Sequence, residues 1–465
     1  MNRTLIRVLC GIAAALLLMA GAAAIYGLQT ELPDGMTVSG TDIGGFSKEQ
    51  AIRRIEEQAR GIGEKKVLMK AGLRGNGEVQ RSAALKDMGL RTNAEALAGE
   101  IHRLFEGNVW ERAWKRWRSR GRELTLHGGL DRKQFSGAMR KLWPELYDTQ
   151  PVDAVRIITA DDRVTYRQEV TAQRLDEFTL LKRVTENIPE DSIAIEVPLY
   201  EEPPKITVAS LKEQGVERLI SSYSTSLASS GKGRVHNVRS AAAVVHDMLL
   251  APGDVFDYAE VIRKTEEKYG FCEAPVIVNG KLVPGVGGGI CQVSTTIYNA
   301  ALRAGLDIVE RRNHSLPISY APLGQDATFA SGYINFKFRN STGKHLLIRT
   351  SIENNKLTVK IFGTLDPNVT YEIKSVTLET IQPGVKYVKN ASLPKGKVEL
   401  IQRGKPGYVV ETYRYKKVGG KMVEKERISK DTYKPQPALY ASNTGEDAEP
   451  SPGRGPVIED GVGAN

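Results

Sequence analysis

A cysteine stands where a glycine-rich loop meets a predicted helix. Residues 285–289 contain four glycines, and apolar residues then recur at three- and four-residue steps until Gly305, which predicts a helix that begins near residue 290. Cys291 therefore falls in the first turn, where unpaired N–H groups and the helix dipole favour an anion. A thiol placed there is a candidate nucleophile. The amide groups of Gly287, Gly288 and Gly289 are candidates for binding a developing oxyanion.

The same stretch has a purely structural explanation, which the spacing alone favours. A glycine loop entering a helix is a common turn, and cysteine packs well as a small core residue. Gln292, Ser294 and Thr295 follow in the next turn and are candidates for substrate contacts. The two hydroxyl groups would otherwise bond back to the helix.

A cysteine nucleophile needs a base, and two histidines are candidates. His314 follows soon after the predicted helix and a short predicted strand, so the returning chain would bring it near Cys291; we therefore prefer it to His236. Cys272 offers a different partner, because a Cys272–Cys291 disulfide would silence the nucleophile; two free thiols are the favoured alternative. The ligand spacing of a metal site is missing from the sequence, so we expect neither a metal nor a cofactor.

Six blocks of sequence resemble a VanW domain over residues 223–363. They read YSTS (223–226), RVHNVRSAA (234–242), APGDVFDY (251–258), EAPVIVNGKLVPGVGGGICQVSTTIYNA (273–300), GLDIVERRNHSLPISY (305–320) and FKFRNSTGKHLLI (336–348). The resemblance implies a role in the bacterial cell wall. For some VanW domains it also implies L,D-transpeptidase activity, with the cysteine that matches Cys291 as nucleophile.

The amino terminus predicts an export signal that also anchors the chain. Arg3 and Arg7 precede an uncharged run over residues 8–28, which is long enough to cross a bilayer with the remainder of the chain outside. A cleaved signal peptide is the alternative, because Ala22 and Ala24 form an A-x-A site before Ile25. The length of the run favours the anchor.

Charge and cysteine content agree with an extracytoplasmic protein. The 465 residues carry a net charge of +10, which suits peptidoglycan with its anionic wall polymers or lipid headgroups, and the export signal argues against nucleic acid. Only three cysteines occur, and Cys10 lies in the apolar run, so the chain has no disulfide framework.

Residues 31–200 predict an α+β region. Ser47 with Gln50, and Asp131 with Gln134, mark two helix starts, while residues 154–160 and 192–200 read as strands. The opening PDGMTVSGTDIGGFSKEQA resembles that of the YoaR-like peptidoglycan-binding region, which implies wall binding but assigns no site residues.

One predicted helix in this region is rich in tryptophan and arginine. Trp110, Trp114 and Trp117 share a helical face, with five basic residues around it: Arg112, Lys115, Arg116, Arg118 and Arg120. Contact with a membrane surface or an anionic polymer is one interpretation. Burial of the tryptophans in the core is the other, and it is the one we favour.

The remainder of the chain reads as strands followed by a tail. Alternating apolar residues flank a Gly419–Gly420 turn, which indicates a hairpin. Residues 368–445 resemble a G-five domain, a small all-β module of surface proteins, and we expect them to fold alone. The resemblance implies adhesion to wall polymers. Residues 446–465 are rich in Gly, Pro and acidic residues and predict a disordered tail.

The sequence thus predicts a multidomain envelope protein on a single transmembrane helix. An α+β peptidoglycan-binding-like region (31–200) would precede an α+β VanW domain (205–365) and the all-β module. Two functions remain open: a cysteine L,D-transpeptidase acting on peptidoglycan stems, and a non-catalytic protein that binds or scaffolds peptidoglycan. Rapid alkylation of Cys291 near neutral pH would favour the first.

Overall fold

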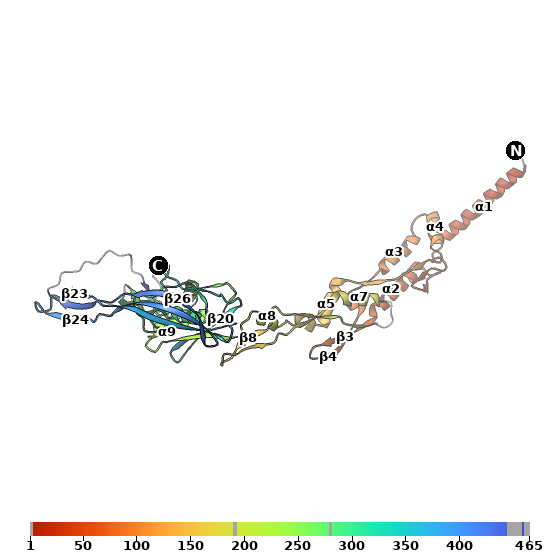
Figure 1. Cartoon of the computed structure of the whole chain (residues 1–465). Helices are drawn as coiled ribbons and strands as arrows, with labels where there is room; N and C mark the ends of the chain where they lie inside the picture. Colours follow the sequence, from red (N-terminus) through yellow and green to blue (C-terminus); the bar gives the residue numbers. More distant parts are fainter. Residues whose placement is uncertain (1–2, 189–192, 279–280, 444–457, 460–465) are drawn as a thin grey trace. The chain divides into compact units, whose positions relative to one another are not determined.

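The computed structural model describes residues 3–188, 193–278, 281–443 and 458–459. Their helices and strands divide into two compact units. Unit 1 holds residues Met1–Asp153 and Glu169–Lys205, and unit 2 holds Ala154–Gln168 and Ile206–Asn465. Figure 1 colours the chain from its amino terminus to its carboxyl terminus.

Unit 1 begins with one long apolar helix, α1 (Arg3–Leu28). Within its stretch Leu5–Leu28, an 18-residue window has a mean hydropathy of 2.5 and none of its residues is buried. Helices of this length and composition serve as membrane anchors or signal peptides. The structure thus agrees with the predicted apolar segment, which is consistent with a membrane anchor and with a signal peptide.

The first core of unit 1 lies between short strands and two helices. β1 (Thr37–Val38) pairs with β2 (Thr41–Asp42) and with β6 (Glu123–Leu124), and α2 (Lys48–Glu64) and α3 (Ala94–Leu104) pack over the apolar cluster. Ser47 caps α2 in a capping box with Gln50, as the sequence predicts. α4 (Val109–Ser119) follows and lies against the end of α1 (Figure 1).

A second core of unit 1 lies under the sheet β11-β3-β4. Its strands are β3 (Lys66–Leu73), β4 (Gly77–Ala84) and β11 (Ile193–Glu196), and α5 (Arg132–Leu142) and α7 (Glu177–Glu186) contribute to the same apolar cluster. Asp131 caps α5 by accepting from the Gln134 amide, as predicted. The smaller elements are η1 (Leu85–Met88), β5 (Leu90–Thr92), β7 (Gly128–Leu130), α6 (Glu145–Asp148), β10 (Ala172–Leu175) and β12 (Leu199–Glu202).

The tryptophans of α4 are not in either core, so the interpretation we favoured is wrong. Trp110, Trp114 and Trp117 are 55%, 58% and 60% exposed. The buried residues of α4 are Ala113, Arg116 and Ser119. A face of small residues and one buried arginine therefore docks this helix, and the large aromatic side chains point to the surface.

Unit 2 is built on a four-stranded antiparallel sheet in the order β13-β21-β20-β14. Its strands are β13 (Arg218–Ser226), β14 (Met248–Leu250), β20 (Leu346–Glu353) and β21 (Lys356–Gly363). Three helices pack with it: α9 (Lys232–Val245), α10 (Tyr258–Tyr269) and α11 (Ile290–Arg303). A smaller sheet joins β15 (Val255–Asp257), β19 (Lys337–Arg339) and β18 (Asp307–Glu310), and the hairpin β16 (Glu273–Val278) and β17 (Lys281–Val286) leads into α11.

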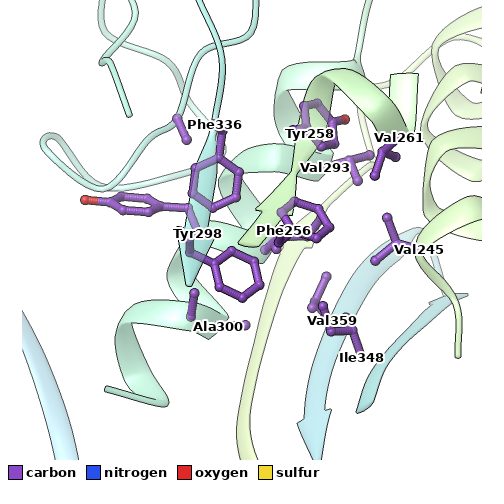
Figure 2. Close-up of a cluster of buried hydrophobic side chains, with 14 of the residues drawn as sticks. Val245, Phe256, Tyr258, Val261, Val293, Tyr298, Ala300, Phe336, Ile348 and Val359 are labelled. Atoms are coloured by element: carbon purple, nitrogen blue, oxygen red, sulfur yellow. The ribbon is translucent and has the colours of Figure 1, made fainter. Parts of the chain in front are cut away.

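The helix α11 is the centre of this core. Every residue from Ile290 to Leu302 is buried, so the helix is enclosed on all sides rather than on one face as the apolar spacing predicts. Figure 2 shows aromatic side chains gathered around it, including Tyr298 against Phe336 with rings 5.7 Å apart. Such a helix is positioned rigidly, because interiors are close-packed and any shift creates voids or clashes.

Unit 2 also contains residues Ala154–Gln168, which the sequence prediction places in the region 31–200. Residues 154–160 do form a strand, β8 (Val155–Ile158), which pairs with β9 (Val164–Arg167). This hairpin and α8 (Val208–Glu213) belong to unit 2, where Asp162 binds Lys360 of β21 at 2.6 Å. Within the predicted region 31–200, residues 154–168 therefore pack with unit 2.

The carboxyl-terminal part of unit 2 is all-β. β22 (Val369–Ile381), β25 (Gly407–Val418) and β26 (Lys421–Tyr433) form one antiparallel sheet, and β23 (Val385–Lys389), β27 (Ala438–Ser442) and β24 (Val398–Gln402) form another. The predicted hairpin turn is present: Gly419 and Gly420 have φ of 55° and 79°, and Val418 faces Lys421. Most of the predicted disordered tail lies outside the described residues, but Ile458–Glu459 within it form β28, which pairs with β16.

Candidate active site

Cys291 lies in the first turn of α11, as the sequence predicts. The chain arrives from β17 through Gly287 and Gly289, whose φ angles of 87° and 108° are in the left-handed region that favours glycine. A side chain at Gly288 would place its Cβ 2.5 Å from the carbonyl oxygen of Pro275. These glycines thus let the loop turn sharply while it packs against β16.

The amides of this loop are partly occupied by the protein itself. Gly287 N–H donates to the Cys272 carbonyl, Ile290 N–H to Gly287, and Gln292 N–H to Gly289. All three loop glycines are buried. An oxyanion role for the loop amides stays a prediction, and it requires this loop to open.

The thiol of Cys291 is fully enclosed, with an exposed fraction of 0%. Its sulfur accepts a hydrogen bond from the Phe329 amide at 3.1 Å and lies 3.4 Å from the Phe329 carbonyl oxygen. Cys272 is exposed just before β16, outside this enclosure, and both cysteines are free thiols. The structure therefore has the favoured arrangement of two thiols rather than the disulfide.

His314 is buried in a fixed orientation by Asp326. The Asp326 carboxylate accepts from the His314 ring at Nδ1 and from its backbone amide, both at 2.7 Å. Because an ionised carboxylate only accepts hydrogen bonds, Nδ1 carries the proton and Nε2 is the ring atom left for proton exchange. The other candidate base, His236, is exposed on α9.

One segment, residues 326–329, connects the thiol to the histidine. Asp326 binds His314, and the Thr328 amide donates to the Arg312 carbonyl at 2.8 Å. Phe329, at the other end, holds Cys291. Cys291 and His314 thus contact opposite ends of the same short stretch, and this stretch fixes the position of one side chain relative to the other.

Two of the three polar residues predicted to bind substrate hold this segment against α11. Ser294 donates to the Ala327 carbonyl at 2.7 Å, and Thr295 accepts from the Ala327 amide at 3.0 Å. Gln292 instead ties the helix to β13 by donating to Ser226 at 2.8 Å. All three are buried, so in this conformation they position the site, and a contact with substrate stays a prediction.

A buried cluster of charge surrounds Asp326. Arg311 contacts Asp326 at 3.2 Å and Asp431 at 2.6 Å, and Tyr433 donates its hydroxyl to Asp326 at 2.5 Å. Burial by itself raises the pKa of Asp326, but hydrogen bonds from His314 and the charges of His314 and Arg311 lower it to about 2. Asp326 therefore stays ionised at neutral pH and keeps accepting from His314.

Two members of this cluster come from the all-β part of the chain. Asp431 and Tyr433 lie on β26, and Tyr433 also accepts from the Gly324 amide at 2.6 Å. Arg414 of β25 donates to the Leu306 carbonyl just after α11. The sequence does not reveal the roles of Asp326, Asp431 and Tyr433, because no local pattern connects Asp326 with positions about a hundred residues away.

This interface ties the all-β part to the rest of unit 2, and independent folding of residues 368–445 stays a prediction. Tyr433→Phe should destabilise unit 2 by about 1–3 kcal/mol, because it leaves the buried Gly324 amide without its partner and removes a bond to a carboxylate. Denaturant unfolding of the chain would measure the loss. Tyr440→Phe is the matched control, since Tyr440 is half-buried against Tyr387 and should change stability little. Equal effects of the two substitutions would contradict the cooperative interface.

Comparisons with known proteins identify both parts of unit 2. Residues 233–362 match the family described as VanW like protein, and residues 372–444 match the G5 domain. The uncharacterized protein YoaR of Bacillus subtilis is 36% identical over 170 residues, which cover 37% of this chain and 56% of that protein. The vancomycin B-type resistance protein VanW of Enterococcus faecalis is 26% identical over 174 residues, which cover 36% of this chain and 63% of that protein.

Two solved G5 structures are also similar. The IgA1 protease G5 domain is 27% identical, covers 18% of this chain and 96% of its own, and has a TM-score of 0.14 over the whole chain. HP0197-G5 is 28% identical, with coverages of 16% and 96% and a TM-score of 0.12. The chain spans a little over half the length of the curated relatives it matches. The chain thus combines an apolar amino-terminal helix, a region that matches VanW like protein and a carboxyl-terminal region that matches the G5 domain.

Proposed function

We propose that the VanW-like domain is a cysteine acyltransferase of the L,D-transpeptidase type that acts on peptidoglycan stem peptides. The observation that carries this proposal is that one short segment, residues 326–329, bonds to Cys291 through Phe329 and to His314 through Asp326. A nucleophile, a base and a carboxylate that orients the base are the parts that acyl transfer through a cysteine requires.

The reaction would proceed in two balanced steps. The Cys291 sulfur attacks the carbonyl of an L-centre in the donor stem while Nε2 of His314 takes the thiol proton. The amide bond to the terminal D-residue breaks, its amine leaves with that proton, and a thioester remains. An amine of a neighbouring stem then attacks the thioester, which restores the thiol and forms the cross-link.

Enclosure of the thiol means that a substrate enters only when part of the site opens. Residues 315–323 form an irregular stretch, from which Tyr320 meets the His314 ring edge-on at 6.4 Å. Among the described residues, the buried hydroxyl of Thr328 has no hydrogen-bond partner, although it lies between the residues that bind Cys291 and His314. A polar group of a bound stem would supply one.

Incubation of the chain with defined donor and acceptor stems tests the proposal. Mass spectrometry should detect a cross-linked product and the released D-residue in equal amounts. An intact donor after prolonged incubation, with stems of several compositions, would remove the enzymatic assignment.

A second candidate function is favoured by the burial of Cys291. Its zero exposure and the internal bonds of Gln292, Ser294 and Thr295 are what a packed core helix has. In this alternative the chain binds or scaffolds peptidoglycan and other anionic wall polymers through its G5 domain and residues 31–200. Alkylation kinetics separate the two: a site that opens gives a Cys291 that reacts fast near neutral pH, with exposed Cys272 as reference, whereas a packed thiol reacts slowly.

We expect the chain to stay in the membrane after export, with its bulk extracytoplasmic. Cleavage before Ile25 would remove Ala22 and Ala23, which lie beside α4 in the folded chain. The full-length chain should therefore remain in the membrane fraction after an alkaline wash that strips peripheral proteins. A soluble form whose amino-terminal sequence begins near Ile25 would show that the segment is a signal peptide.

A further inference from the structure

Three of the four tryptophans of this chain form one exposed face on α4. Trp110, Trp114 and Trp117 are more than half exposed, and the rings of Trp114 and Trp117 stack at 5.4 Å. The fourth, Trp143, is fully buried in unit 1. Large aromatic side chains are usually buried, so a contiguous exposed set indicates a surface that meets something else.

The contact between α4 and α1 fixes where this face lies. A Cβ added to Gly27 would come 2.1 Å from the Val109 carbonyl oxygen, so glycine permits the two helices to touch there. Arg116, 1% exposed, donates to the backbone and side chain of Gln29 at 3.2 and 2.9 Å, and its guanidinium lies 5.2 Å from the Tyr26 ring. Small residues and one buried arginine thus join α4 to the end of the apolar helix.

A cleft of about 470 Å³ runs between the two helices. Ala22, Ala23 and Tyr26 of α1 line one side, and the three tryptophans with Ala113 and Arg120 line the other. The 24 residues of Leu5–Leu28 extend about 36 Å at about 1.5 Å each, which exceeds a hydrocarbon core of about 30 Å. The last turns of α1, which line the cleft, therefore lie at the membrane–water boundary when α1 spans a bilayer.

We infer that the Trp110–Trp114–Trp117 face inserts into the headgroup region of the bilayer that α1 spans. Tryptophan is enriched at this boundary because its ring is apolar while its N–H finds polar partners. The exposed side chains of Arg118 on this helix and of Arg120 at its carboxyl-terminal cap suit anionic headgroups. The tryptophan face lies beside the end of α1, a helix of membrane-spanning composition. This position favours lipid as its partner over a wall polymer or a second copy of the chain.

The inference is independent of any chemistry at Cys291 and rests on α1 remaining in the membrane. Its consequence is structural: α4 would hold unit 1 against the membrane surface, so that the chain leaves the bilayer at a fixed angle. An anchor helix alone would leave unit 1 to swing freely about its last turn.

Tryptophan quenching by brominated lipids tests the inference on the full chain in anionic vesicles. Flotation with the vesicles first establishes that α1 has inserted. Lipids brominated near the headgroup end of the acyl chain should remove the greater part of the emission of the wild-type chain. The variant Trp110→Ala/Trp114→Ala/Trp117→Ala retains only buried Trp143 and should lose almost none. A wild-type chain that floats but is not quenched would overturn the inference.

Two glycine substitutions test whether α1 positions the face. Gly27→Ala should reduce the quenching while flotation persists, because its Cβ pushes α4 away from α1. Gly21→Ala is the control, since a Cβ there meets nothing within 4 Å. Unchanged quenching in Gly27→Ala would overturn the role of the contact. A change in emission on adding purified cell-wall fragments to unbrominated vesicles, with no quenching by brominated ones, would assign the face to a wall polymer instead.

Discussion

Cys291→Ser is expected to abolish formation of cross-linked stems, with a fall in rate of at least ~1000-fold. Serine fits the enclosed position and can accept from the Phe329 amide, so the domain should fold normally. The serine hydroxyl is far less acidic than a thiol, so the His314–Asp326 pair would have to activate a much weaker nucleophile. Turnover of defined stems, followed by mass spectrometry, measures the effect.

Cys272→Ser is the matched control for this substitution. Cys272 is exposed and free, so its replacement should leave turnover unchanged and stability within about 0.5 kcal/mol. A Cys291→Ser protein that still joins stems would exclude the nucleophile and leave the wall-binding function as the better proposal.

Asp326→Asn should have the second-largest effect on turnover, because the Asp326 carboxylate binds His314, Arg311 and Tyr433. An amide no longer fixes the tautomer of His314, so we expect turnover to fall roughly 10²–10⁴-fold. It also leaves Arg311 with a single carboxylate in the interior, which should cost about 3 kcal/mol or more in unfolding free energy. Asp307→Asn, an exposed substitution on β18, is the control and should change neither quantity appreciably.

The same residue makes stability depend on pH in a defined direction. The pKa of Asp326 falls from 3.8 to about 2 on folding. A carboxyl with a lower pKa when folded stabilises the protein above its unfolded pKa and loses that contribution as pH falls through its folded pKa. The wild-type chain should therefore lose about 2 kcal/mol from this group between about pH 4 and pH 2. An Asp326→Asn variant with the same acid dependence as wild type would contradict the assignment.

Local features of this fold are readable from the sequence. The start of α11, the capping residues Ser47 and Asp131, and the turn at Gly419–Gly420 each depend on neighbours a few residues away. Candidate roles for Cys291 and His314 were accessible for a similar reason, because residue type and a short connection suggested them.

What the sequence could not supply are the contacts between distant segments. Asp326 looks like any loop aspartate until its partners from β26 are placed beside it. The pattern of α4 predicts buried tryptophans, because an amphipathic helix normally buries its aromatic face. The structure buries Ala113, Arg116 and Ser119 instead, and Gly27 lets α4 pack closely against the end of α1.

The Asp431 and Tyr433 contacts carry a consequence for how such proteins diversify. G5 domains look exchangeable, because each is a small module joined by a short connection. In this chain a G5 domain from another protein would need an aspartate at position 431 to bind Arg311 and a tyrosine at position 433 to bind Asp326. Recombination between relatives should therefore preserve the pair as a block, and chimaeras that cut between the domains should recover function only when both positions are restored.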